Sequence, residues 1–333
     1  MKVGYLGTGS WGYCLATILA SKGYYVVCWT TKAELAATLN KTRSHPFLPA
    51  HKSKGNLFVT TDLEETLADS DLLVESVTSA GLRPVLEKVH AIDPNLSIPL
   101  IITSKGIEQD TGLILPDVAI EVFGERFRPL VGVLSGPGYA SEVIQGLPTS
   151  VVASGYSASV IQTICDTFAT ENFRVYPNSD VRGVAFGGSL KNIIAIACGI
   201  ADGLSLGNSA KAALMTRGLH EIRKLAVACG CKAETLNGLS GMGDLCMTCS
   251  SPLSRNYRFG NIIAKGTSPA EAHREIKMVV EGAYTCLSAL QLSAKYNVRM
   301  PITDTVYKIL YEQLKPRDAV MLLMKRPIKE ESA

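Results

Sequence analysis

Short apolar runs alternate with helix-length segments through the first half of the chain. Lys2–Leu6 and Tyr24–Trp29 are strand-length apolar runs, as expected when both faces of a sheet are covered, and Trp11–Lys22 between them has helical spacing. Strands that alternate with helices predict a parallel, doubly wound sheet with right-handed crossovers. Further strands are predicted at Leu57–Thr60, Asp71–Val77, Leu100–Ser104, Leu130–Leu134, Ser150–Ala153 and Phe173–Tyr176.

The pattern changes after about Asn178, where apolar residues recur at helical spacing. A chain of 333 residues is longer than a typical single domain. We therefore predict a doubly wound α/β domain over residues 1–178 and an all-helical domain over residues 179–333, whose polar tail from Arg326 frays. The predicted helices are Val181–Leu204, Ala210–Cys229, Pro269–Lys277, Tyr284–Tyr296 and Ile302–Tyr311.

Composition indicates a globular protein and argues against several kinds of partner. Hydrophobic residues make up 47% and charged residues 19%, whereas disorder needs low hydrophobicity and high net charge. The net charge of +3 is small, and no basic block is dense enough for a nucleic-acid or membrane surface. The richest apolar run, Ile193–Ile200, is shorter than the roughly 20 residues that span a bilayer. The start MKVGYLG lacks the pattern of a secretory signal, so a cytoplasmic location is the default expectation.

Nine cysteines are scattered through apolar segments. An odd number in such places fits reduced, buried thiols better than a disulfide framework. Four of them could in principle bind zinc as thiolates, although Cys-x-Cys is an unusual first half for such a site. The alternative is inert buried thiols, and we predict no metal. The four are Cys229, Cys231, Cys246 and Cys249.

The stretch Gly7-Thr-Gly9-Ser-Trp-Gly12 matches the pattern G-x-G-x-x-G. It follows an apolar strand and opens a helix within a βαβ unit, which is the context that a dinucleotide-binding turn requires. Gly7 would permit the tight turn, Gly9 the approach of the pyrophosphate, and Gly12 the packing of helix on strand. The helix that begins with Ser10 and Trp11 would offer unpaired N–H groups to the phosphates. The turn thus predicts a Rossmann-type domain, with an ordinary strand-to-helix turn as the alternative.

The end of the second predicted strand bears on which dinucleotide binds. An NAD-specific site usually has Asp or Glu about 20 residues after the glycines, where it binds the ribose 2′-hydroxyl. Here the sequence reads Trp29-Thr30-Thr31-Lys32, with no acid to repel a 2′-phosphate and a lysine to attract it. We predict that NADP or NAD binds and that NADPH is mildly favoured. The alternative is that Lys32 is a solvated lysine of a first helical turn.

Two lysines stand in places where lysine is unusual. Lys191, followed by Asn192, is the one cation in the long apolar segment 184–204, and a buried ammonium needs a partner or a lowered pKa. Such a lysine can donate a proton to a carbonyl that becomes an alcohol. Lys105 directly follows a predicted strand, where ligands of open α/β sheets bind. The alternatives are a Lys191 that reaches solvent along its stem and a Lys105 in a solvated loop.

Three further segments are candidates for binding. The loop 135-SGPGYASE-142 follows a predicted strand and either binds substrate or cofactor through its backbone or merely turns the chain. In the helical half, Asp244 lies at a glycine turn, where it could hold a hydroxyl or orient Lys191. A phosphate could bind at Arg255, whose planar guanidinium donates two parallel hydrogen bonds, with Ser254 and Asn256 as neutral donors beside it. Surface charge is the alternative for these charged residues.

Together these segments resemble the NAD(P)-dependent glycerol-3-phosphate dehydrogenase family in its bacterial form. The resemblance extends over nearly the whole chain, and seven segments in the right order are far more specific than any one. It implies a Rossmann domain followed by an all-helical domain, and interconversion of dihydroxyacetone phosphate and sn-glycerol 3-phosphate. The segments are Gly7-Thr-Gly-Ser-Trp-Gly12, Ser104-Lys-Gly106, Ser135-Gly-Pro137 with Ala140, Leu190-Lys-Asn192, Gly243-Asp-Leu245 with Thr248 and Cys249, Ser254-Arg-Asn256, and Val280-Glu-Gly282.

The resemblance also implies a role for individual residues. Lys191 would be the general acid in reduction and the base in oxidation, and the product would supply the backbone of glycerophospholipids. Asp244 would support Lys191 or a substrate hydroxyl. The implied substrate contacts are Lys105, Gly136, Lys191, Asp244, Ser254, Arg255 and Asn256, and the implied cofactor contacts are Gly7, Gly9, Ser10, Trp11, Gly12, Lys32, Lys105, Ala140, Arg255, Val279 and Glu281.

One position departs from the family pattern, and other functions stay open. Where the family usually has Ser or Thr two places after Gly136, this chain has Gly138, which leaves only backbone for contact with substrate. The nearest alternatives are 3-hydroxyacid and 6-phosphogluconate dehydrogenases, which share the architecture. An alternative of another class is a nucleotide-sensing protein that binds the cofactor without turnover. The expected partner is a small-molecule substrate, and a homodimer is a possible assembly.

Overall fold

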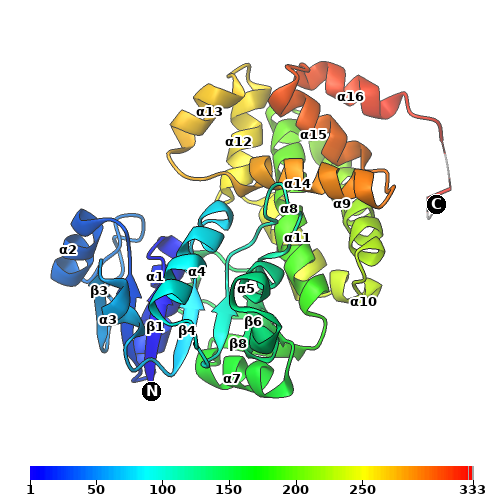
Figure 1. The fold of residues 1–333 in the computed structure, drawn as a ribbon. Coiled ribbons are helices and arrows are strands. Elements are labelled where there is room, and N and C mark those ends of the chain that lie inside the picture. The colour runs from blue at the N-terminus through cyan, green and yellow to red at the C-terminus, as the bar shows by residue number, and fades with distance from the viewer. Residues whose placement is uncertain (329, 332–333) are drawn as a thin grey trace.

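The computed structural model describes residues 1–328, 330 and 331, which form an α/β part and a helical part (Figure 1). The α/β part has one eight-stranded sheet with the order β3-β2-β1-β4-β5-β6-β7-β8. The order extends from β1 in both directions, which confirms the predicted doubly wound arrangement. The strands are β1 (Lys2–Leu6), β2 (Tyr25–Trp29), β3 (Leu57–Thr60), β4 (Leu72–Glu75), β5 (Leu100–Ile102), β6 (Val131–Ser135), β7 (Thr149–Gly155) and β8 (Phe173–Asn178).

Neighbouring strands are parallel except β6 and β7, which are antiparallel. The prediction of a parallel sheet is wrong at this one pair. The connection between them contains only the one-turn helix α6 (Ala140–Val143), which is too short to carry the chain back along the sheet. The chain therefore returns directly in β7, and α7 (Ala158–Phe168) then forms a parallel crossover to β8.

Helices cover both faces of the sheet, and alternate strand residues enter different cores. Leu72 and Val74 of β4 belong to the core under α1 and α7, whereas Leu73 belongs to the core under α4 and α5. All three side chains are fully buried, so their period-two alternation decides which face each one covers. The other helices here are α1 (Ser10–Ser21), α2 (Ala33–Thr42), α3 (Leu63–Leu67), α4 (Ser79–Ile92), α5 (Leu115–Phe123) and the 3₁₀ helix η1 (Glu125–Leu130).

The helical part is built around α8 (Val181–Gly203), which is buried along nearly its whole length. Glycines let α12 (Arg255–Ala264) lie directly against it, because a Cβ on Gly199 would lie 2.0 Å from the Tyr257 carbonyl oxygen. Among the described residues, α8 alone has the length and composition to cross a membrane, yet 94% of its most apolar window is buried inside the protein. Its apolar surface is therefore core. The other helices are α9 (Gly207–Ala228), α10 (Ala233–Leu236), the π-helix η2 (Leu239–Gly243), α11 (Asp244–Ser250), α13 (Pro269–Ile276), α14 (Glu281–Lys295), α15 (Pro301–Tyr311) and α16 (Pro316–Met324).

Most predicted elements are present, with ends that differ by three residues or fewer. Helices α10, α11, α12 and α16 were not predicted, because each is short and three of them lie in glycine-rich or polar stretches that resemble loops. The last strand ends at Asn178 and α8 begins at Val181. Of the predicted frayed tail, Arg326 to Ile328 are exposed, and residues 329, 332 and 333 lie outside the described residues.

Candidate active site

The turn between β1 and α1 has the shape that its glycines allow. Gly7 has a φ of 98°, where side chains are disfavoured, and a Cβ on Gly12 would lie 2.3 Å from the Gly7 carbonyl oxygen. Gly9 faces open space, since a Cβ there would meet nothing within 4 Å. Two glycines thus shape the turn, and the third leaves room above it for a ligand, as dinucleotide-binding turns do.

The N-terminus of α1 has the features of an anion site. Gly9, its N-cap, supplies no side-chain cap, and the first turn contains no acidic residue. The first backbone N–H groups are therefore available, and the helix dipole adds partial positive charge. Three buried polar atoms of this turn have no hydrogen-bond partner: Thr8 Oγ1, Ser10 Oγ and Trp11 Nε1. Buried polar atoms normally have partners, so these atoms fit a site completed by a polar ligand.

Lys32 lies beyond the carboxyl end of β2, at the N-cap of α2, and is exposed. It lines a cavity of about 480 Å³ with Thr38 and Pro46. Glu34, in the first turn of α2, lines the same cavity. A 2′-phosphate there would meet a lysine and an acid together, whereas the predicted preference for NADPH rested on the lysine alone.

The loop after β6 packs its backbone against the dinucleotide turn. Gly138 faces the indole of Trp11, and a Cβ on Gly138 would lie 3.2 Å from Trp11 Cη2. A serine or threonine at this position would have to displace the indole by a few tenths of an ångström. Ala140 follows as the first residue of α6 and is half-buried.

Lys191 and Lys105 meet at one buried carboxylate. Asp244 is fully buried; its Oδ1 accepts a hydrogen bond from Lys191 Nζ and its Oδ2 accepts one from Lys105 Nζ at 2.6 Å. Lys191 Nζ also donates to Thr248 Oγ1 at 2.6 Å, and Lys105 Nζ donates to the Gly136 carbonyl at 2.9 Å. The alternatives of a solvated Lys191 and a solvated Lys105 are wrong, since their side chains are only 6% and 19% exposed. Two ammonium groups against one carboxylate leave this cluster positively charged.

Burial lowers the pKa of Lys191 to about 8, from an ordinary value of 10.5. Burial is the largest cause of this net shift; the positive charge of Lys105 acts in the same direction, and the negative charge of Asp244 opposes both. At neutral pH the ammonium form dominates, yet its proton is much more easily released than that of a solvated lysine. A pKa near the working pH is what general acid–base catalysis needs.

Asp244 owes its position to a change of helix type. The π-helix η2 (Leu239–Gly243) leads directly into α11, whose first residue is Asp244. Such π segments are rare and frequently occur at functional sites. Thr248 lies one turn later in α11, on the same face, and this spacing lets both side chains reach Lys191.

The N-terminus of α12 is a second candidate anion site. Ser254 is its N-cap, and Ser254 Oγ accepts a hydrogen bond from Tyr257 N at 3.2 Å, which leaves the hydroxyl hydrogen free to donate. Arg255 is the first helical residue, and the first turn has no acidic residue. The backbone N–H groups, the hydroxyl and the guanidinium can therefore all face an anion.

Asn256 has two protein partners of its own. Asn256 Nδ2 donates to Asn192 Oδ1 at 3.0 Å, and Asn256 Oδ1 accepts from Gly282 N at 2.9 Å. These bonds tie the start of α12 to α8 and to α14. One N–H of the amide is left for a ligand, so Asn256 can contact substrate only as a single donor.

Glu281 connects the helical part to the α/β part. It is the first residue of α14, and its carboxylate accepts hydrogen bonds from Ser79 N at 3.3 Å and from Ser79 Oγ, at the start of α4. Burial raises the pKa of Glu281, whereas Ser79 and the charge of Arg255 lower it. Burial also lowers the pKa of Arg255, and Glu281 opposes this effect. Arg255 and Glu281 are thus electrostatically coupled. Val279, two residues before Glu281, is exposed.

Glu75 was missed by the sequence analysis. It ends β4 and is fully buried, and its carboxylate accepts from Val77 N at 3.1 Å, Thr103 N at 3.2 Å, and Ser104 N and Oγ at 3.2 and 2.9 Å. It therefore joins the loops after β4 and β5 and fixes the residue that precedes Lys105. Burial raises the pKa of Glu75 to about 7. One signal was available: an acid directly after the apolar run Leu72–Val74 of a predicted strand.

The cysteines do not form a metal site. All nine are free thiols, and seven of them are buried. No group of three or more His, Cys, Asp or Glu in the described part of the chain is arranged to hold a metal ion. The zinc interpretation of Cys229, Cys231, Cys246 and Cys249 is therefore wrong. Burial raises the pKa of Cys231 to about 12, as expected for an inert thiol.

Comparison with known proteins matches both halves of the chain to one family. The model of the NAD-dependent glycerol-3-phosphate dehydrogenase N-terminus matches residues 2–160, and that of the C-terminus matches residues 180–321. A glycerol-3-phosphate dehydrogenase (NAD(P)+) from Protochlamydia amoebophila is 66% identical over 331 residues, which are 99% of each chain. One from Chlamydia pneumoniae is 52% identical over 329 residues, covering 99% of this chain and 98% of that one.

A solved structure extends the likeness to three dimensions. The crystal structure of glycerol-3-phosphate dehydrogenase from Coxiella burnetii superposes with a TM-score of 0.93 at 35% sequence identity, over 98% of this chain and 99% of that one. Sequence and fold therefore agree along nearly the whole length of the chain. The chain belongs to the NAD-dependent glycerol-3-phosphate dehydrogenase family.

Proposed function

We propose that this chain interconverts dihydroxyacetone phosphate and sn-glycerol 3-phosphate with NAD(P)H, and that Lys191 is its general acid. The observation that carries the proposal is the buried contact of Lys191 with Asp244. The ammonium group has a lowered pKa there, and the hydrogen bond to Asp244 holds Nζ in one position. The names of the relatives supply the substrate pair and the cofactor. The reaction provides glycerol phosphate for phospholipid synthesis.

Reduction of a ketone adds a hydride to the carbonyl carbon and a proton to the carbonyl oxygen. The reduced nicotinamide, when bound, supplies the hydride to the carbonyl carbon. Lys191 donates the proton from Nζ to the carbonyl oxygen as negative charge develops there, and in oxidation the neutral amine takes it back. Asp244 and Thr248 hold Nζ in place, and Lys105 keeps the site positive, which favours the developing oxyanion.

The phosphate of the substrate binds at the start of α12. Arg255 pairs with it, Ser254 and the first backbone N–H groups donate to it, and Asn256 adds at most one N–H. Gly136 contributes backbone near Lys105. Binding the remote phosphate fixes the ketone against Lys191, so this contact contributes to turnover as well as to affinity.

The cofactor binds over the glycine turn. Gly7 and Gly12 shape the turn, and Gly9, Ser10 and Trp11 at the N-terminus of α1 would hold its pyrophosphate. Lys32 would meet a 2′-phosphate, which mildly favours NADPH over NADH. The remaining cofactor contacts of this proposal are Lys105, Ala140, Arg255, Val279 and Glu281.

Three features of the whole chain belong to the same proposal. The division into domains 1–178 and 179–333 follows the last strand and the start of α8. Nine free thiols fit a cytoplasmic location, where cysteines stay reduced. A homodimer is the proposed assembly, and light scattering on the purified chain measures it directly.

A substrate panel with both cofactors tests the function. We expect reduction of dihydroxyacetone phosphate with NADPH and with NADH, and no oxidation of 3-hydroxy acids or 6-phosphogluconate. Preferential oxidation of either of these would show instead that the chain is a 3-hydroxyacid or a 6-phosphogluconate dehydrogenase. Cofactor binding without turnover of any substrate would instead indicate a nucleotide-sensing protein.

A further inference from the structure

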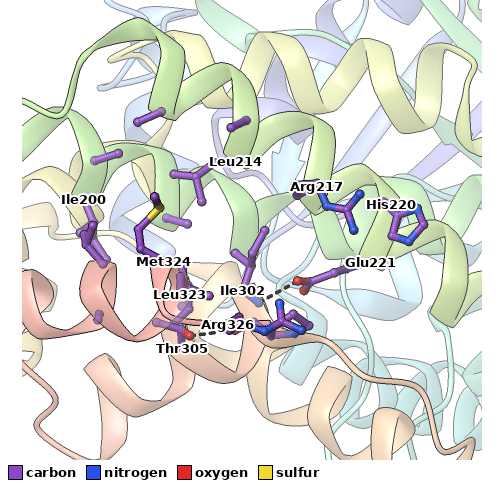
Figure 2. Close-up of a pocket in the computed structure, with 18 of the residues that line it drawn as sticks. Ile200, Leu214, Arg217, His220, Glu221, Ile302, Thr305, Leu323, Met324 and Arg326 are labelled. Atoms are coloured by element: carbon purple, nitrogen blue, oxygen red, sulfur yellow. Dashed lines mark hydrogen bonds between the residues drawn. The ribbon is translucent and has the colours of Figure 1, made fainter. Parts of the chain in front are cut away.

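The helical part contains a cavity of about 600 Å³ that the proposed reaction does not use. Residues of α8, α9, α15 and α16 line it (Figure 2). Its α8 residue nearest to Lys191 is Ala197, about 9 Å further along the helix axis, and neither Lys191 nor Asp244 is among its lining residues in the described chain. The volume falls within the range of small-molecule sites, which is about 300–1,000 Å³.

The two ends of this cavity have opposite character. Ile200, Leu214 and Met324 project into one end, whereas Arg217 and Arg326 lie at the other (Figure 2). The apolar end is continued by small residues of α8 and α9, which leave space between the helices. The cations that line the cavity are Arg217, Lys224, Arg299 and Arg326.

The acids at the basic end neutralise it only in part. Glu221 is buried, and its carboxylate accepts hydrogen bonds from Ile302 N at 2.7 Å and Thr303 N at 3.3 Å, at the N-terminus of α15. Burial raises the pKa of Glu221 to about 7, and the nearby charge of Arg326 opposes this effect. Glu330 and Glu331 also line the cavity, in the tail, where Arg217 Nη1 donates a hydrogen bond to the backbone carbonyl of Glu331. Four cations therefore line the cavity with three carboxylates, which leaves this end with a net positive charge.

One wall of the cavity is loosely packed. Ala319 is the one buried residue of α16. Of its other apolar residues that line the cavity, Val320 and Leu323 are only half-buried, and Met324 is 77% exposed. A helix that leaves so much apolar surface uncovered is suited to close over an apolar ligand.

We propose that this cavity binds a single-chain amphiphile with an anionic head, of which a long-chain carboxylate or alkyl phosphate is the simplest form. The alkyl chain lies between α8, α9 and α16, and the head meets the cluster of arginines and lysine. An alkyl chain matches the apolar end in chemistry, and a charged head matches the basic end. The occupant contacts α8, the helix that carries Lys191.

Calorimetric titration of the full-length protein tests the site with defined probes below their micelle concentrations. The probes are dodecanoate and dodecyl phosphate, compared with dodecyltrimethylammonium and with neutral dodecyl maltoside. We expect saturable binding of one anionic probe per chain. Each shortening of the chain by two carbons should weaken binding roughly tenfold, since every buried CH₂ contributes to affinity. The two anionic arms distinguish a carboxylate from a phosphate head.

Two pairs of variants place the binding in this cavity. Ala213→Trp fills the cavity from an exposed position of α9, and Ala212→Trp puts the same side chain on a neighbouring exposed position that does not line it. We expect the first to weaken binding more than tenfold and the second less than twofold. Arg217→Glu should likewise weaken binding about tenfold, with Arg223→Glu on the same helix as its control.

Several results would overturn the proposal. These are the absence of saturable binding, equal binding of the cationic probe, or equal effects of Ala213→Trp and its control. Binding lost together with a dimer in the Ala213→Trp variant, as seen by light scattering, would show that a second copy of the chain covers this face instead. All variants lie outside the proposed catalytic machinery, so normal turnover confirms that each one is folded.

Discussion

The dinucleotide turn and the lysine cluster both place polar groups for a ligand next to a hydrophobic core, but they are built in different ways. The turn is contained in six consecutive residues, from Gly7 to Gly12, and is shaped by sterics alone. The cluster joins Lys105, Lys191 and Asp244, and one of its contacts spans 139 residues of sequence. A local motif can thus specify a site by conformation, whereas the cluster exists only when the two parts of the protein pack together.

The energetics of the two regions differ in the same way. The turn buries no charge, so its main energetic cost is the conformational entropy that the glycines lose on folding. The cluster buries a carboxylate that is stable only because both its oxygens have cationic partners. Removing one partner should therefore affect chemistry and stability together in the cluster, whereas a change at Gly9, which faces open space in the turn, should affect binding alone.

The largest expected effect is that of Lys191→Ala. Loss of the proton donor should lower kcat by about 10²- to 10⁴-fold, which is the usual contribution of general acid catalysis. Binding of NADPH should stay nearly unchanged, because the turn does not depend on Lys191. Steady-state kinetics and fluorescence titration of NADPH measure the two effects. Lys211→Ala, which removes the lysine that pairs with Asp202 on a neighbouring helix, is the control. Unchanged turnover in Lys191→Ala would refute its role.

Arg255→Ala should have the next largest effect. A charge-assisted hydrogen bond contributes about 1.5–3 kcal/mol, so its loss should raise the KM for dihydroxyacetone phosphate about 10- to 100-fold. Arg258→Ala is the matched control, because Arg258 lies one turn later in α12 and is exposed. If both variants change the KM equally, the effect is one of general charge and the phosphate site at α12 is wrong.

Gly9→Ala separates the two regions most directly. A Cβ on Gly9 meets no protein atom, so thermal stability should not change, but the methyl group should intrude on the pyrophosphate and weaken NADPH binding about tenfold. Gly12→Ala, by contrast, should lower the melting temperature, since its Cβ would collide with the Gly7 carbonyl. A stable Gly9→Ala variant with unaltered cofactor affinity would mean that the ligand does not lie over the turn.

The pH dependence of the rate tests the cluster without a mutation. Reduction needs the ammonium form of Lys191, whose pKa is about 8, so kcat should fall about tenfold between pH 7 and pH 9. Oxidation needs the neutral amine and should rise over the same interval. The charge of Lys105 contributes to the lowered pKa, so Lys105→Met should move both profiles to higher pH. If the profiles do not shift, Lys105 does not contribute to the lowered pKa of Lys191.

The sequence predicted those features that depend on neighbours in the chain. The strands, the glycine turn and the apolar setting of Lys191 are local patterns, and the structure has the strands, the turn and the buried lysine. The contact between Lys105 and Asp244 was not predicted, because these residues are 139 positions apart and meet only when the two parts of the protein pack together. The reversal at β7 was missed because the connection after β6, which contains only the one-turn helix α6, was not recognised as too short for a crossover. Glu75 was missed because one acid in a strand has no periodic pattern.

The smallest expected effect concerns Lys32, where the turn region meets solvent. An exposed lysine contributes about 0.2–1 kcal/mol to an ion pair, so Lys32→Ala should reduce the preference for NADPH over NADH by at most about fivefold. Glu34 lines the same cavity and opposes a 2′-phosphate, so Glu34→Gln should change the ratio in the opposite direction. Lys41→Ala, on the exposed last turn of α2, should leave it unchanged. The ratio of kcat/KM for the two cofactors is the measurement. If Lys32→Ala and Lys41→Ala give the same ratio, the Lys32 side chain does not select the cofactor. Only the backbone of the glycine turn would then contribute to cofactor binding in this region.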